Sequence, residues 1–576
     1  MNQRTRTSLE ILQASALLGL LGNLLLRQKP WGVNAFLFVT VFVAALLMLI
    51  RRRRPELFTT NTIALTGAMV FFASMFLIRD SIQLRVADTF AIIILMGVVM
   101  LVNFGIKANI AGAFHYVAGA IWAGLNSVFG SFVLLGSDIE WKAMPGNKIS
   151  RVAFAILRGL AIALPLVLIF GALFVAADAA FEGMVNRVFN FDFETIVSHV
   201  VLTSLFAWLS AGYFRGVVAV WPAQNPAAAS AEKSAAAESD SSDSPVAKVV
   251  AEPGEAAASL PDNATILEHI NRSDPPNAEE SNTKKKRDWQ NFDSSILPSV
   301  FTLGKIEIGI ILGLLNALFL SFVIFQVQYL FGGMELVQNT PDFKLADYAR
   351  RGFGELVAVS ALVLPLLLLS HWLVRRDSGK TETLFRVLAG SQIVMLFVIM
   401  ASAVQRLVLL TGELGYGMTT VRFYPMVFMT WLAVVFVWFA LTVFRGARNH
   451  FAWGALWSAI VILGATNLMN PDAFIVRTNI ALMHQGREFD APYNAGSLSD
   501  DAIPVVLEAL PSMSADDQCA TKWRLHNRMI GAVDESDLRS WNLSRANSRS
   551  LLEENYQAFD DHGECEVSVP IPNPEL

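Results

Sequence analysis

Runs of apolar residues, each close to 20 residues long, recur along the chain and constrain its fold more than any other feature. A helix needs about 20 such residues to cross roughly 30 Å of hydrocarbon, and helices satisfy their own backbone groups in lipid. Charged residues are only 16% of the 576 residues, against about 25% in an average soluble domain. The sequence therefore predicts an all-α, polytopic membrane protein. Eleven segments are expected to span: Ile11–Leu26, Val33–Ile50, Asn61–Ile78, Ala87–Phe104, Val152–Ala176, His199–Val220, Ile306–Tyr329, Glu355–Val374, Val387–Leu410, Tyr424–Phe444 and Phe451–Leu468.

A polar segment interrupts these runs and divides the chain into four predicted regions. Residues 222–295 are rich in Ala, Ser, Pro, Asp and Glu and poor in large apolar residues. Such a composition buries too little surface to offset the entropy of ordering. We expect a disordered cytoplasmic linker there, between an N-terminal membrane block at 1–221 and a C-terminal membrane block at 296–469. Residues 470–576 carry amphipathic and capped helical patterns and are expected to form a small soluble helical domain.

Lysine and arginine collect in alternate loops, and short cytoplasmic loops are enriched in these residues. The run Arg51–Arg54 follows the second expected span, and the run Lys284–Arg287 lies near the end of the linker. Placing both runs in the cytoplasm puts the N-terminus there and the C-terminal domain outside. This scheme requires Ala108–Leu135 to begin and end on the same side, as an interfacial or re-entrant helix. If that segment spans instead, every earlier segment is inverted.

The two cysteines, Cys519 and Cys565, both lie in the predicted C-terminal domain. Disulfides persist in extracytoplasmic compartments. The expected orientation therefore favours a Cys519–Cys565 bond. In a reducing compartment the two thiols would stay unpaired.

Standard catalytic, nucleotide-binding and metal-binding signatures are absent from the sequence, including the P-loop, H-E-x-x-H and C-x-x-C patterns. No catalytic residue, metal site or cofactor is therefore predicted. One four-residue basic run is too little for a nucleic-acid-binding surface. The expected partners are the lipid bilayer and an unidentified protein that binds the outer domain.

Ionisable residues inside apolar segments are a better functional signal, because each is costly in lipid unless it is paired or hydrated. Asp88 lies near the start of the fourth expected span, and Arg158 lies inside the fifth. Glu355 opens the eighth, four residues after Arg351, so the two can share a helix face. These four residues are the candidate polar sites. Both an inter-helix salt bridge and a transport site remain open for them.

Several motifs resemble a known family. They are Leu157–Leu166 with Asp178 following, Tyr348–Phe353, Tyr416–Thr419 with Arg422–Tyr424, Asn470–Ala473 and Trp541–Arg545. These residues resemble the bacterial membrane proteins grouped as domain of unknown function 4173, which is related to 4153. The resemblance implies a bacterial integral membrane protein, hence the inner membrane, and it supplies no activity.

Three functions remain open. The preferred hypothesis is a structural or signalling membrane module whose extracytoplasmic domain binds a partner. The second is a solute or lipid transporter, because the spacing of Phe206–Trp208 and Phe214–Gly216 recurs in Phe436–Trp438 and Phe444–Gly446, as in a transporter with internal repeats. The third is a membrane enzyme, for which no nucleophile or metal cluster converges in the sequence.

Overall fold

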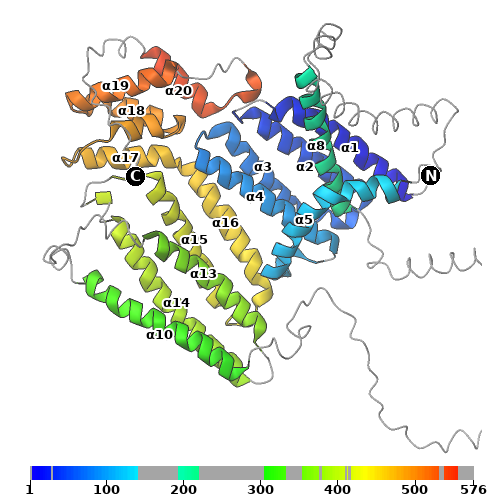
Figure 1. Cartoon of the computed structure of the whole chain (residues 1–576), viewed down its shortest axis with the longest axis horizontal. Coiled ribbons are helices and arrows are strands. Elements are labelled where there is room, and N and C mark those ends of the chain that lie inside the picture. Colours follow the sequence, from blue (N-terminus) through cyan, green and yellow to red (C-terminus); the bar gives the residue numbers. More distant parts are fainter. Residues whose placement is uncertain are drawn as a thin grey trace, which may run out of the picture. The chain divides into compact units, whose positions relative to one another are not determined.

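Every element of the described structure is a helix (Figure 1). The structure is a computed structural model, and it describes residues 3–27, 30–104, 106–139, 193–218, 304–331, 353–374, 379–408, 411–412, 417–530 and 537–555. The expected all-α class is confirmed for these residues. The expected linker at 222–295 and the expected span Val152–Ala176 lie outside them and stay predictions.

Eleven of the described helices are long and apolar enough to cross a membrane, judged by length and composition. Ten of them coincide with expected spans, and the eleventh, α5, covers the segment that was expected not to cross. The chain is thus a multi-pass membrane protein. The helices are α1 (Gln3–Leu26), α2 (Val33–Arg53), α3 (Thr60–Ile78), α4 (Ile82–Leu101), α5 (Ala113–Val133), α8 (Phe193–Val218), α10 (Lys305–Phe331), α13 (Phe353–Leu373), α14 (Gly379–Val408), α15 (Thr420–Thr442) and α16 (Phe451–Met469).

The membrane helices pack around two apolar cores. Helices α1 to α5 and α8 share one core, which includes Leu46, Phe72 and Phe214. Helices α10 and α13 to α15 share the second, which includes Phe385 and Phe436. Helix α16 contacts both groups and so joins them, through Trp453, Leu456 and Ile460 on the first side and Phe451 on the second.

Small residues allow the first group to pack closely. Gly212 on α8 lies against the backbone of α5, and a Cβ added there would stand 2.2 Å from the carbonyl oxygen of Asn126. Backbone approach of this kind is the usual way in which helices associate in lipid, where no hydrophobic force drives them together. The α5–α8 contact therefore depends on a residue without a side chain at position 212.

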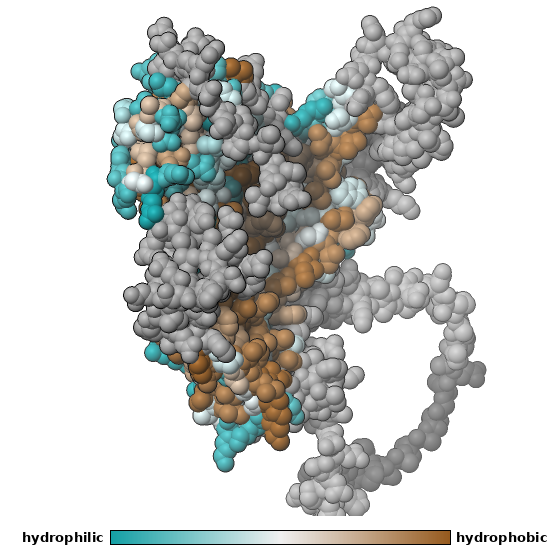
Figure 2. Space-filling view, turned by 60° about the vertical axis from the view of Figure 1, so that its left-hand side comes forward, coloured by the Kyte–Doolittle hydropathy of each residue, from teal (hydrophilic) through white to brown (hydrophobic). Residues whose placement is uncertain are grey.

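The C-terminal domain is a small helical unit that follows α16. Asn470 adopts a left-handed conformation (φ 59°) and its side chain accepts a hydrogen bond from the Ala473 N–H, so it ends α16 and starts the next helix. Figure 2 shows hydrophilic surface gathered over this domain and apolar surface over the membrane helices. Its helices are α17 (Pro471–Met483), α18 (Ile503–Ala509), α19 (Ala515–Ile530) and α20 (Leu543–Glu554). Its core includes Ile475, Val476, Ile503, Val506 and Leu525.

Side-chain contacts at the helix termini distinguish two ends of the bundle. At one end, Arg4 in the first turn of α1 and Arg215 in the last turn of α8 both bind Asp138, each at 2.6 Å. At this end Arg54, after α2, also donates to Asn103, which follows α4. We call this end the basic end. At the opposite end, the termini of α1 to α4 meet the C-terminal domain.

Both ends of α5 lie at the basic end. Its C-terminal extension reaches Asp138, which binds Arg4 and Arg215. Just before α5 begins, the carbonyl of Asn109 contacts the His450 ring at 3.1 Å. His450 directly precedes α16, and that end of α16 is the one far from the C-terminal domain. Phe114 in its first turn stacks on Trp372 near the end of α13. Although α5 is long enough to span a membrane, the contacts at its two termini both lie at the basic end.

Candidate functional site: the junction of the C-terminal domain with the membrane helices

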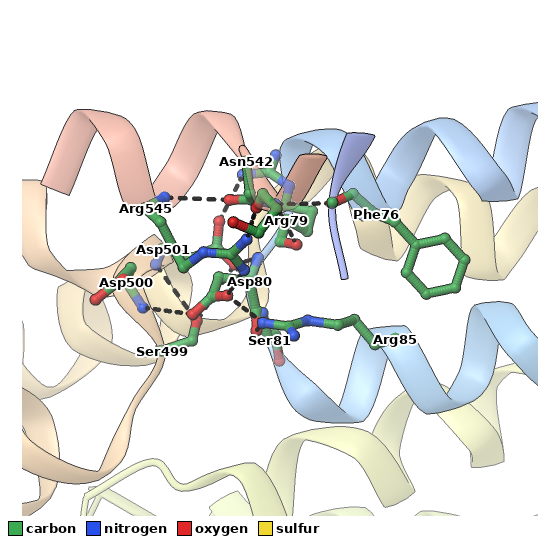
Figure 3. Close-up of polar contacts among 12 residues, drawn as sticks. Phe76, Arg79, Asp80, Ser81, Arg85, Ser499, Asp500, Asp501, Asn542 and Arg545 are labelled. Carbon is green, nitrogen blue, oxygen red and sulfur yellow. Dashed lines mark hydrogen bonds and ion pairs between the residues drawn. The ribbon is translucent and has the colours of Figure 1, made fainter. Parts of the chain in front are cut away.

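A dense group of charged residues joins the C-terminal domain to the turn between α3 and α4 (Figure 3). The turn supplies Arg79, Asp80 and Ser81, and the first turn of α4 adds Arg85. The domain supplies the partners, which are Asp472, Ser499, Asp500, Asp501, Asn542 and Arg545. We call these residues the domain junction. Four aspartates meet three arginines here, and Arg528 on α19 pairs with Asp500 as a fourth at 2.9 Å.

Asn542 caps two helices at once. Its side-chain oxygen accepts from the N–H of Arg545 at 3.1 Å, which caps the start of α20. Its side-chain nitrogen donates to the carbonyls of Phe76 (2.8 Å) and Arg79 (2.9 Å), which end α3. Helix termini leave such backbone groups without intrahelical partners. One buried amide therefore satisfies the end of a membrane helix and the start of a domain helix together.

Asp501 caps α4 from outside that helix. One of its oxygens accepts from the N–H groups of Asp80 (2.8 Å) and Ser81 (3.1 Å), where α4 begins. The Ser81 side chain makes no capping bond of its own. A carboxylate is favoured at a helix N-terminus because the peptide dipoles leave partial positive charge there. The Arg79 guanidinium also lies 3.5 Å from the second oxygen of Asp501.

Two further helix ends are bound by the residues just before α20. Arg539 donates to the carbonyl of Leu24 at 2.8 Å, near the end of α1. The carbonyl of Trp541 accepts from the N–H of Val33 at 3.0 Å, where α2 begins. Gly32 lies so close that an added Cβ would stand 2.2 Å from that carbonyl oxygen. The C-terminal domain thus binds the ends of all four of the first membrane helices.

Each aspartate of the domain junction already has partners. Asp80 pairs with Arg85 and with Arg545, the latter at 2.8 Å. Asp472 accepts from the backbone N–H (3.1 Å) and the hydroxyl (2.5 Å) of Ser499. Burial raises the pKa of Asp472, and the hydrogen bonds from Ser499 offset this only in part. Burial likewise raises the pKa of Asp500, against the lowering effect of Arg528.

A buried carboxyl group lies two turns into α4 from this junction. Asp88 accepts from the side-chain nitrogen of Asn467 on α16 at 2.9 Å. Arg79 in turn donates to the carbonyl of Asn467 at 2.7 Å. Asp88 is therefore connected to the domain junction through Asn467 and Arg79.

Of the four candidate polar residues, Asp88 alone lies within the described structure with its side chain. Arg158 and Arg351 lie outside the described residues, and Glu355 opens α13 with a side chain that is not described. Cys519 lies on α19 and Cys565 lies outside, so the predicted disulfide stays a prediction. Among the described residues, no group of three or more His, Cys, Asp or Glu residues could hold a metal ion.

Sequence reasoning missed most of the domain junction. The sequence pattern places Asp500 and Asp501 only in the acidic first turn of a helix that Ser499 caps, and it gives no role to Arg79, Asp80 or Arg528. A signal was present, because the Trp541–Arg545 motif contains Asn542 and Arg545, and the Asn470–Ala473 motif contains Asp472. Asp138, which binds two arginines at the basic end, also went unnoticed.

Two of the hollows in the described surface lie beside the C-terminal domain or its junction. A groove of about 710 Å³ runs along α4 near the domain junction and is lined by Pro30, Trp31, Ile82, Arg85, Val86, Thr89 and Phe90. A more polar pocket of about 300 Å³ lies between the start of α15 and the C-terminal domain, with Asn479, Glu488, Asp490 and Tyr493 among its lining residues.

The comparisons with known proteins identify a family and nothing more specific. No curated protein and no solved structure matches the chain. The model of one family, described as a domain of unknown function (DUF4153), matches residues 66–243 and 269–509. The matched residues include four aspartates of the domain junction together with Asp88, and they end before Asn542. The family is 4153 rather than its relative 4173, to which the motifs were compared. With more than half of its length matched, the chain belongs to the domain of unknown function 4153 family.

Proposed function

We propose that this chain is a bacterial inner-membrane protein in which an extracytoplasmic helical domain is coupled to the membrane helices as a structural or signalling module. The observation that carries the proposal is the binding of four helix ends by one domain. Asn542, Asp501, Arg539 and the Trp541 carbonyl bind the ends of α3, α4, α1 and α2. A partner that moves the domain would alter all four contacts together.

The orientation in this proposal rests on charge. The basic end carries Arg51–Arg54, Lys107 and Arg215, and the positive-inside pattern assigns such an end to the cytoplasm. The C-terminal domain then lies outside. The chain leaves α5 at the basic end and enters α8 at the other, so the expected span Val152–Ala176 would supply the crossing between them.

Thiol labelling tests this orientation. Arg52→Cys and Asp516→Cys, at two exposed positions, would each be introduced into a chain carrying Cys519→Ser and Cys565→Ser. A membrane-impermeant maleimide should label Asp516→Cys in intact cells and Arg52→Cys only after permeabilisation. The reverse pattern would overturn the orientation. A reporter enzyme that is active only outside the cytoplasm, fused after Leu576, gives the same answer without the serine substitutions.

Hydrogen exchange tests the coupling. Asn542→Ala removes both caps, and exchange should rise at the end of α3 and the start of α4 as well as in α20. Asn555→Ala is the matched control, because the Asn555 side chain, just after α20, donates to the Leu551 carbonyl of that helix and to no membrane helix in the described structure. Exchange that changes in α20 alone in both variants would show that the domain is not coupled to the membrane helices.

A second function, lipid transport, is favoured by the groove along α4. Ile82, Val86 and Phe90 expose large apolar side chains there, and Arg85 lies at the end nearest the polar junction, as an acyl chain with an anionic headgroup requires. Val86→Trp would fill the groove and should slow lipid movement between leaflets in reconstituted vesicles. Ile93→Trp, on an exposed position of α4 that does not line the groove, should leave the rate unchanged. Equal rates in all three proteins would reject this function.

A further inference from the structure

Asp88 and Asp138 are both almost fully buried, yet their surroundings differ. Asp138 binds two guanidinium groups, those of Arg4 and Arg215. Asp88 is 1% exposed, and among the described residues it forms no ion pair; its hydrogen-bond partner is the Asn467 amide. An isolated carboxylate in such a setting carries a large desolvation cost. Asp88 therefore requires another source of neutralisation.

The Asn467 side chain shows what is missing. This residue is fully buried, and its nitrogen donates both to Asp88 and to the carbonyl of Leu463, at 2.9 and 3.0 Å. Its side-chain oxygen has no hydrogen-bond partner within the described structure. An ionised Asp88 would add only further acceptors to this site. A protonated carboxyl group would instead supply an O–H donor, which the site lacks.

We propose that Asp88 and Asn467 form a proton-binding site among the membrane-spanning helices. The proton resides on the Asp88 carboxyl group, which accepts from the Asn467 amide and offers its O–H as a donor within the same pocket. A metal cation fits the site less well, because calcium takes about six to eight oxygen ligands and the two side chains provide three. The inference does not depend on the proposed role of the C-terminal domain.

The charged groups around Asp88 are committed elsewhere. On its own helix, Arg85 turns back to Asp80. From the end of α3, Arg79 binds the carbonyls of Asn467 and Leu468 and pairs with Asp501. From α15, the Tyr424 hydroxyl contacts Ser81 at 3.1 Å. From the C-terminal domain, Asp472 is bound by Ser499. Since none of these groups forms an ion pair with Asp88, a proton is the neutralising partner that remains.

Loss of the proton from Asp88 would affect the domain junction, because Asn467 contacts a residue of that junction. Asn467 lies in the last turn of α16, and its carbonyl binds the same Arg79 that pairs with Asp501 at the start of α4. Loss of the proton would place a charge beside the Asn467 side chain. The disturbance would then reach the domain junction through one residue.

Infrared spectroscopy of the purified full-length protein in lipid nanodiscs tests the proposal. The protein should show a protonated-carboxyl band at neutral pH that is lost in Asp88→Asn. The band should shift in Asn467→Val, which removes the amide, and in Asp88→Glu, which keeps a carboxyl group. Asp138→Asn should leave the band in place, because the partners of Asp138 are the guanidinium groups of Arg4 and Arg215 rather than the Asn467 amide. A neutral-pH spectrum in which no protonated-carboxyl band depends on position 88 would overturn the site.

Thermal unfolding gives an independent readout. Asparagine resembles the protonated form of aspartate in shape and charge, so Asp88→Asn should keep the melting temperature of the parent protein. Asp138→Asn should lower it, because a charge that two arginines require is removed. An equal loss of melting temperature in the two variants would show that Asp88 is ionised in the folded state, against the proposal. The exchange experiment on Asn542 reports on the C-terminal domain and is unaffected by either result.

Discussion

The two ends of the bundle use buried carboxylates in opposite ways. At the basic end, Asp138 binds two arginines, Arg53 and Arg54 pair with Glu10 and Glu56, and the neighbouring Arg51 and Arg52 add further positive charge. At the domain junction, four aspartates meet four arginines and the charges balance. An excess of positive charge is typical of the cytoplasmic end of a membrane protein. A balanced network is instead suited to holding two parts of a chain together.

The two clusters also differ in what they join. Asp138 and Arg215 are 77 positions apart, and both belong to the first group of membrane helices. Asp80 and Arg545 are 465 positions apart and join the turn between α3 and α4 to α20, the last described helix of the C-terminal domain. The first cluster is therefore expected to stabilise the bundle itself, and the second to decide whether the domain stays bound. The following changes test that division.

The largest effect is expected from Asp138→Ala. Arg215 is nearly buried and would lose this carboxylate, and breaking one partner of a buried ion pair costs about 3–5 kcal/mol; Arg4 is mostly exposed and contributes little. The melting temperature of the first helix group, measured by thermal denaturation in detergent, should fall strongly. Glu382→Ala is the control, because its pair with Arg386 is exposed and worth about 0.5 kcal/mol. Equal effects of the two changes would contradict the assignment.

Asp501→Ala is expected to have a smaller and more local effect. It removes the group that caps α4, a loss of about 1–2 kcal/mol by comparison with other N-caps. Proteolysis should then release the C-terminal domain sooner while the membrane helices stay folded. Asp516→Ala, at an exposed position in the first turn of α19, is the matched control and should change neither the release of the domain nor the folding of the membrane helices. A global loss of folding in Asp501→Ala would mean that the domain junction, like the basic end, stabilises the whole bundle.

How much of this could be predicted depends on whether a feature is local. Apolar runs locate the spans because composition alone decides whether a segment can lie in lipid, and ten described helices agree with that expectation. The α5 segment has the composition of a span, and the charge pattern was needed to expect both of its ends on one side. Pattern alone could not reveal that Asn542 caps α3, because that bond joins residues 466 positions apart.

The candidate residues show the same limit. Asp88 could be singled out because a charge in an apolar run is conspicuous in a sequence. Asp138 could not, because it ends an apolar segment, where charged residues are common, and its importance comes from α8 returning beside α5. Arg79 and Asp501 lie in polar stretches and acquire their role only when the C-terminal domain docks. Long-range pairing, rather than residue type, separates the residues that were found from those that were missed.

The smallest expected effect is a pH dependence that arises at the domain junction and not at the basic end. Burial raises the pKa of both Asp472 and Asp500 at the domain junction, so the folded state keeps their protons to higher pH than the unfolded state does. Binding of the C-terminal domain should therefore weaken as pH rises through the raised pKa values. Proteolytic release of the domain, followed from mildly acidic to neutral pH, should accelerate with rising pH. Asp472→Asn cannot ionise and should reduce that pH dependence, whereas Asp138→Asn, at the other end, should leave its slope unchanged. A slope that both variants alter equally would mean that the two ends titrate as one unit.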